Sequence, residues 1–175
     1  MKFIIKYNEK PVFDFEYLNL AQMMWTPSFR GEPLEISHTD NDSLNQGYYL
    51  ALSWNKWLND KRWRKSSFNS EYIMMNEIRK PEGTSLHLYV STDHVEIPTV
   101  DQRALYRLIY KITSDFGALI SDDEGVSWEN PELFKSKHRL AMNLKMNLAN
   151  KISLLEQDTL SQEKEEDRDD LIYII

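Results

Sequence analysis

The clearest hydrophobic pattern in the chain lies between residues 99 and 117. Apolar residues recur there with the period of one helix face: Leu105, Leu108, Ile109, Ile112 and Phe116. Thr99 and, three residues later, Gln102 have the form of a capping box, and Gly117 supplies a C-terminal stop. The pattern predicts an amphipathic helix over about 100–116.

A second helical pattern begins at Asn130 and Pro131, an N-cap residue followed by proline at the first helical position. Downstream apolar residues keep helical spacing: Leu133, Leu140, Leu144, Leu148, Ile152 and Leu155. We therefore expect one long helix over about 131–156 that packs against the rest of the domain.

Short runs of alternating apolar residues, or of aromatic and β-branched residues, predict strands. These runs are residues 2–7, 34–38, 72–75, 86–90 and 118–121. Residues 12–17 can form a hairpin with 2–7, although residues 15–25 fit a helix equally well. Residues 44–58 fit both periods, and we favour a strand. A turn at 80–83 predicts a further hairpin.

Together these elements predict an α+β fold, a mostly antiparallel sheet packed against two main helices. The 175 residues fit a single globular domain over 1–160 and an acidic tail over 161–175. Without cysteine the chain can form no disulfide, thiolate metal site or cysteine nucleophile. It has no long apolar run and no secretory signal pattern, so we expect a cytoplasmic protein that does not enter a membrane.

The net charge of -7 is unevenly distributed. Residues 135–151 hold five basic side chains and no acid, whereas residues 154–175 hold eight acids and two bases. The tail is either a solvated charge run or a segment that folds back over the basic helix. Residues 171–175 form an apolar pentad that we expect to dock on a sheet edge or on a partner.

No catalytic or phosphate-binding motif is present, and the five glycines are scattered. His87, Asp93 and His94 come nearest to a carboxylate–imidazole pair, with His38 as a further candidate. Acidic residues in turns need no metal to explain them, because their side chains bond nearby backbone N–H groups. We therefore expect no cofactor, no metal and no enzymatic activity, while a site assembled in space remains an alternative.

Residues 54–65 interleave three tryptophans with five basic residues. This mixture can bind single-stranded nucleic acid, anchor a core or form a protein-binding hot spot. The sequence pI of about 5.1 favours the core interpretation. Binding of nucleic acid through this segment is kept as an alternative function, as is a phage or structural accessory role.

Residues 99–134 resemble a stretch of small bacterial immunity proteins of contact-dependent and polymorphic toxin systems. The shared features are an amphipathic helix ending at Gly117, an apolar run at 118–120, an acidic turn at 122–125, Trp128 and a helix start at 131–134. The resemblance covers about a fifth of the chain. It implies a protein that neutralises a cognate toxin by occluding it, and it carries over no catalytic residue.

On this hypothesis the partner is a protein toxin with a basic cleft, and acidic and aromatic side chains contact it. The candidate contact residues are Asp122, Asp123, Glu124, Trp128, Asp40, Asp42 and Trp57. The two acidic groups form one surface only if their loops converge. The acidic tail is a second candidate surface, and the oligomeric state is left open.

Overall fold

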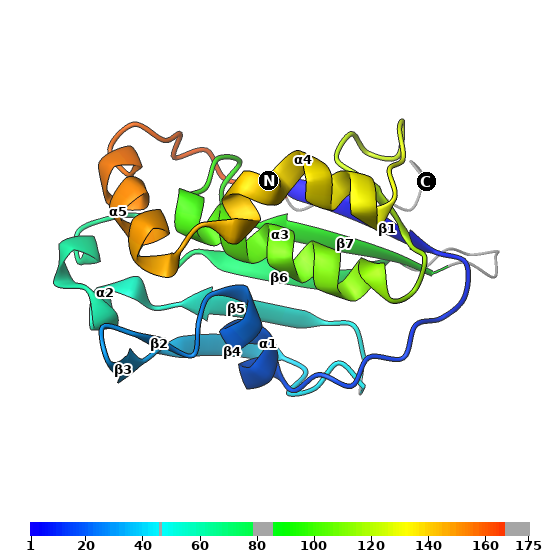
Figure 1. Ribbon diagram of the computed structural model, residues 1–175, viewed down its shortest axis with the longest axis horizontal. Coiled ribbons are helices and arrows are strands. Elements are labelled where there is room, and N and C mark those ends of the chain that lie inside the picture. The colour runs from blue at the N-terminus through cyan, green and yellow to red at the C-terminus, as the bar shows by residue number, and fades with distance from the viewer. Residues whose placement is uncertain (46, 79–85, 167–175) are drawn as a thin grey trace.

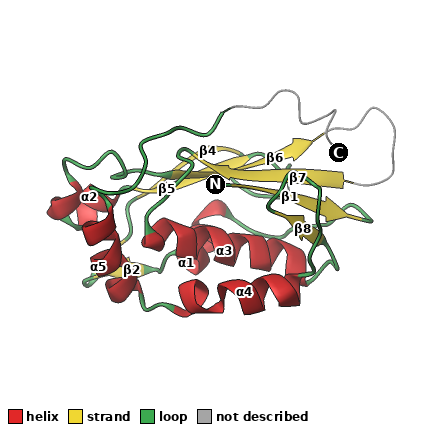
Figure 2. Ribbon diagram, turned by 90° about the horizontal axis from the view of Figure 1, so that it is seen from above, coloured by secondary structure: helices red, strands yellow, loops and turns green. Residues whose placement is uncertain are grey.

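The computed structural model describes residues 1–45, 47–78 and 86–166. Six strands in this part of the chain form one antiparallel sheet, and helices α1, α3, α4 and α5 lie on one side of it (Figures 1 and 2). The α+β fold expected from the sequence is confirmed.

The strands have a simple order across the sheet. They are β4 (Ile36–Asp40), β5 (Leu50–Trp54), β6 (Tyr72–Ile78), β7 (Leu86–Thr92), β1 (Lys2–Tyr7) and β8 (Leu119–Ser121). The helices are α1 (Tyr17–Met24), α2 (Lys56–Asn59), α3 (Thr99–Ser114), α4 (Pro131–Asn143) and α5 (Met146–Glu156). A separate ribbon pairs β2 (Ser28–Phe29) with β3 (Glu32–Pro33), and a 3₁₀ turn covers Lys61–Trp63.

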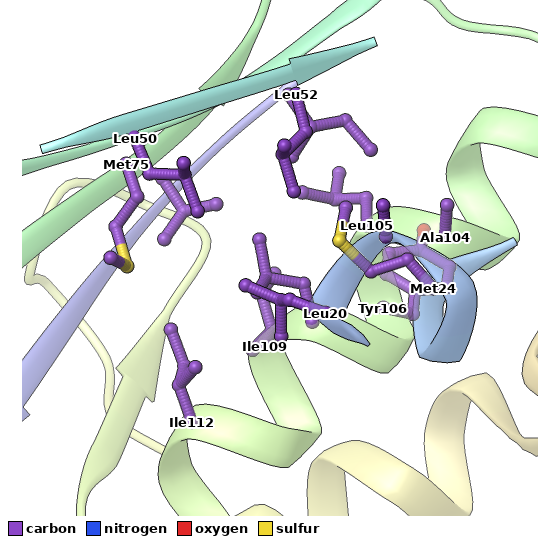
Figure 3. Packing of buried hydrophobic residues seen from close by; sticks show 14 of the residues in the cluster. Leu20, Met24, Leu50, Leu52, Met75, Ala104, Leu105, Tyr106, Ile109 and Ile112 are labelled. Atoms are coloured by element: carbon purple, nitrogen blue, oxygen red, sulfur yellow. The ribbon is translucent and has the colours of Figure 1, made fainter. Parts of the chain in front are cut away.

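The core lies between the sheet and the helices. Alternate residues of each strand point toward the helices, as the two-residue period of a strand requires. Leu50, Leu52 and Met75 of the sheet pack in this way near Leu20 of α1 and Ile109 of α3 (Figure 3). A smaller cluster on the opposite face of the sheet contains Ile4, Ile78 and Tyr89.

Each of the five predicted strand regions contains a strand, but the N-terminal hairpin is wrong. β1 pairs with β7 and β8, with Ile4 opposite both Tyr89 and Ser121. Between β7 and β8 the backbone groups on both edges of β1 are paired, which a hairpin with residues 12–17 alone would not provide. Residues 12–17 are left outside the sheet, and the helical alternative is realised as α1.

The favoured strand within residues 44–58 is confirmed in part, as β5, and the helix α2 follows it. β6 and β7 pair as the second predicted hairpin requires. The turn at 80–83 lies outside the described residues, as does the pentad at 171–175.

The helix predicted over 100–116 is confirmed as α3, and Gly117 follows it with a φ of 58°. The expected capping box is absent, because Pro98 is the N-cap and Thr99 is already helical. The Thr99 backbone N–H and hydroxyl instead donate to the Glu156 carboxylate, at 2.9 and 2.6 Å. A side chain from α5 therefore caps α3.

The single helix predicted over 131–156 is wrong. Leu144 and Lys145 have extended backbone angles and separate α4 from α5, although Asn130 caps the start of α4 as expected. Four leucines of the predicted apolar stripe are exposed: Leu133, Leu140, Leu148 and Leu155. The buried contacts of α4 are made instead by Phe134 and Met142.

Two arginines of α3 bind the backbone exposed at this break. Arg107 Nε donates to the Met142 carbonyl at 2.9 Å, and Arg103 Nε donates to the Leu144 carbonyl at 2.8 Å. The last carbonyls of a helix have no partner inside the helix. The side chains of α3 therefore satisfy the end of α4.

Candidate functional site

The carboxylates of the acidic turn after β8 form ion pairs and hydrogen bonds with other residues of the chain. Asp122 forms an ion pair with Lys137 at 2.8 Å, and Glu124 forms one with Lys2 at 3.2 Å. Asp123 accepts hydrogen bonds from the hydroxyl and backbone N–H of Ser127, which lower its pKa to about 2. Asp122 and Glu124 are thus already paired with lysines, and Asp123 shapes the turn.

Trp128 lies beside this turn as expected, but half-buried. It packs against the small cluster on the outer sheet face, and Lys6 Nζ lies 5.9 Å from the centre of its ring. The ring therefore covers part of the sheet and is only partly available to a partner.

A cleft of about 320 Å³ opens next to Asp122. Its wall includes Lys2, Tyr106, His138 and Glu165. The His138 ring lies 3.9 Å from the Tyr106 ring, and burial lowers the pKa of the imidazole. Glu165 lies 2.6 Å from the N-terminal ammonium group.

The two acidic groups of the candidate surface do not converge. Asp40 lies at the end of β4 and Asp122 follows β8, and these strands are the two opposite edges of the sheet. Trp57 is on α2, near the end of β4 opposite Asp40, and it is half-buried with Lys61 Nζ 5.2 Å from its ring centre. The condition for one shared surface, that the two loops converge, is therefore not met.

The structure instead assembles exposed carboxylates along the β4 edge. Glu16 forms a backbone bridge with Ser43, and the Tyr17 N–H donates to the Asp42 carbonyl, which brings the start of α1 beside the residues after β4. We call the exposed residues Glu16, Glu35, Asp40 and Asp42 the acidic rim. Among the described residues, none of the four forms an ion pair with lysine or arginine, and Asp42 contacts His38 at 2.8 Å.

Glu16 and Glu35 were not among the contact residues expected from the sequence. No local signal could have found Glu16, because only the bridge between distant segments places it near Asp42.

An apolar hollow of about 320 Å³ lies between the residues that precede Glu16 and those that follow Ser43. Its wall includes Pro11, Val12, Phe13, Leu44 and Tyr48.

Two of the three tryptophans of residues 54–65 lie inside the protein, whereas four of the five basic residues are exposed. Trp54 and Trp63 are fully buried, and the indole N–H of Trp63 donates to Asn150 of α5 at 2.8 Å. Lys56 is buried as well. Since stacking on bases needs exposed rings, the core interpretation holds for two of the three tryptophans.

The histidines do not form one site. His38 stacks on Tyr17 at the β4 edge, with 3.6 Å between ring centres. His87 lies in β7 near Trp128, on the sheet face away from the helices. His94 follows β7 and is buried.

A buried ionic group is the main feature that the sequence did not reveal. Lys56 Nζ lies 2.8 Å from Asp101 Oδ2, and Trp25 donates to the other oxygen of Asp101 at 3.2 Å. Nearby, Glu71 Oε2 lies 2.5 Å from His94 Nδ1. Burial raises the pKa of Glu71 to about 7 and that of Asp101 to about 6, and it lowers the pKa of His94. Lys56 is in α2, Asp101 is in α3, and Glu71 and His94 flank β6 and β7, so the group joins elements of the core.

The described tail residues contact the loop after β7. The Val95 N–H donates to the Glu163 carbonyl, and the Glu165 N–H donates to the Asp93 carbonyl. Within these residues no tail carboxylate pairs with a lysine or arginine of 135–151.

Comparison of the chain with protein-family models, curated proteins and solved structures gives no match. None of the helices in the described part combines the length and apolar character needed to cross a membrane. The same residues contain no cluster of three or more histidine and acidic side chains arranged to hold a metal ion.

Proposed function

We propose that this protein is a non-enzymatic binding protein, an immunity protein that neutralises a cognate bacterial toxin by occluding it. The family is suggested by the resemblance of residues 99–134. The observation that supports a binding surface is the acidic rim, whose exposed carboxylates have no lysine or arginine partner among the described residues. Unpaired carboxylates attract a basic surface and increase the rate of encounter.

The rim is a better candidate than the acidic turn. Asp122 and Glu124 would have to exchange existing ion pairs for new ones, and this exchange reduces the gain from binding. Among the described residues, Glu16, Glu35 and Asp40 have no ion pair to exchange, and Asp42 contacts only His38. The apolar hollow beside Leu44 offers surface that a partner can bury at the same end of the molecule.

The test is coexpression of this chain with the protein encoded by the neighbouring gene. We expect the two proteins to co-purify and the toxicity of the neighbour to disappear. A rim variant that combines Glu16→Gln, Glu35→Gln, Asp40→Asn and Asp42→Asn should lower the association rate at least about tenfold, with a smaller effect at high salt.

A matched control variant neutralises the acidic turn through Asp122→Asn, Asp123→Asn and Glu124→Gln. We expect this variant to protect cells nearly as well as the natural sequence. Protection lost in the turn variant but kept in the rim variant would move the interface to the other edge of the sheet. If the chain bound oligonucleotides and no protein, the proposed function would be wrong.

A further inference from the structure

β4 is an edge strand with an unused outer side. The Asn55 N–H donates to the Glu35 carbonyl and the Asn41 N–H donates to the Tyr49 carbonyl, so residues 35 and 41 occupy hydrogen-bonded pairs of the ladder with β5. Antiparallel strands alternate between hydrogen-bonded and non-bonded pairs. Ile36 and His38 are therefore in non-bonded pairs, and their N–H and C=O groups point away from β5.

Nothing in the described part of the chain binds these outward groups. Within residues 1–45, 47–78 and 86–166, no other element forms a backbone or side-chain hydrogen bond to the outward main-chain groups of Ile36 or His38. β4 is also the outermost strand of the sheet in Figure 1, with α1 beside its helix-facing side. An edge of this kind is a template on which another chain can pair.

The charge around this edge selects the kind of chain. Residues 31–55 contain four acids and no lysine or arginine. Edge strands are commonly protected from other chains by lysines, and β4 has none. The acidic rim flanks both ends of the strand, with Glu35 before it and Asp42 after it.

We propose that the β4 edge accepts an extended, lysine- or arginine-bearing segment of the partner protein as an added antiparallel or parallel strand. The main-chain groups of Ile36 and His38 form the ladder, and the acidic rim binds the basic side chains. This inference rests on the proposed function, because the added strand belongs to the toxin. The inference adds how the toxin is bound, by strand addition to β4, which the proposed function does not specify.

The first experiment uses two synthetic peptides, one alternating lysine with threonine and one alternating glutamate with threonine. Binding is followed in amide NMR spectra and by amide hydrogen exchange of the full chain. We expect the lysine peptide to bind at least about tenfold more tightly than the glutamate peptide and to slow exchange at the Ile36 and His38 amides. Slowed exchange only at other amides would overturn the inference.

The second experiment separates the backbone from the side chain. His38→Pro removes an N–H that the ladder with β5 does not use, and proline is tolerated on the outer side of an edge strand. His38→Ala is the matched control, because it removes the same stacking on Tyr17 and the same contact with Asp42 but keeps the N–H. We expect the proline variant to lose peptide binding at least about tenfold relative to the alanine variant.

The same pair of variants distinguishes this inference from the proposed function. If the toxin is neutralised equally by both variants, the function stands and strand addition is wrong. If no toxin is bound but the lysine peptide still pairs with β4, the edge is a strand-binding site and the immunity function is wrong. If the proline variant does not fold, slowed exchange at Ile36 and His38 in the natural chain decides the question.

Discussion

Lys56 and Asp101 form an ion pair at 2.8 Å with neither side chain exposed to solvent. Lys56 belongs to α2 and Asp101 to the first turn of α3. The pair therefore joins two helices that are far apart in the sequence. It also explains why the basic segment around Lys56 does not lie wholly on the surface.

Removing one partner of this pair should be costly. Lys56→Met leaves the Asp101 carboxyl group buried without its cation, and we expect a loss of about 3–5 kcal/mol in the free energy of unfolding. Combining it with Asp101→Asn should restore most of the loss, because the amide still accepts the Trp25 hydrogen bond. Urea unfolding followed by tryptophan fluorescence measures both. As control, Lys61→Met changes an exposed lysine and should cost under about 0.5 kcal/mol.

The Glu71 and His94 pair should respond to pH in opposite ways when each partner is replaced. Burial raises the pKa of Glu71 from 4.5 to about 7 and lowers that of His94 from 6.5. Below pH 6.5, down to the lowered pKa of folded His94, the folded pair holds one shared proton, and the unfolded chain holds one on the histidine. The pair itself should then make stability nearly independent of pH in this range.

In Glu71→Gln burial still holds the pKa of folded His94 below 6.5, so the unfolded chain binds more protons than the folded chain just below pH 6.5. Relative to the natural chain, stability should fall as pH decreases, by up to about 1.4 kcal/mol per pH unit. In His94→Gln the raised pKa of Glu71 remains, and stability should fall as pH rises from 4.5 to 7. Unfolding free energies at several pH values give both slopes, and two slopes of the same sign would contradict the shared proton.

Arg103 should contribute strongly to stability because it holds the ends of two helices. Its guanidinium donates to the Met24 and Trp25 carbonyls at the end of α1, at 3.0 and 2.7 Å, and to the Leu144 carbonyl after α4. Arg103→Met should cost about 2–4 kcal/mol, since two buried carbonyls and one part-buried carbonyl lose their donor. Arg103→Lys should recover little, because one ammonium cannot span these positions. Urea unfolding checks both variants.

Asn150 should matter for the burial of the tryptophan-rich segment. Its side chain accepts from the Trp63 indole and donates to Asp60 at 3.1 Å. Asn150→Leu removes both bonds at similar volume and should cost about 1–3 kcal/mol. Asn147→Leu is the matched control on the exposed side of α5 and should change stability by less than about 0.5 kcal/mol. Equal losses for the two variants, measured by thermal unfolding, would show that these bonds contribute little.

Local patterns in the sequence determined the fold class, α3 and the position of most strands. The stripe that includes Leu105 and Ile112 and the stop at Gly117 act within one helix, so they are readable without the rest of the chain. The same is true of the Asn130 cap, whose bond to the Leu133 N–H spans three residues.

Only the tertiary structure decided where helices break and which charges meet. The carbonyl at the break, that of Leu144, is bound by Arg103, which lies more than forty positions earlier in the chain. The acidic rim forms because the bridge from Glu16 to Ser43 joins distant segments, whereas Asp40 and Asp122 are separated by the width of the sheet. Hydrophobic periodicity specifies which face of an element is buried, but the partner of a buried charge or a strand edge depends on the arrangement of the whole chain.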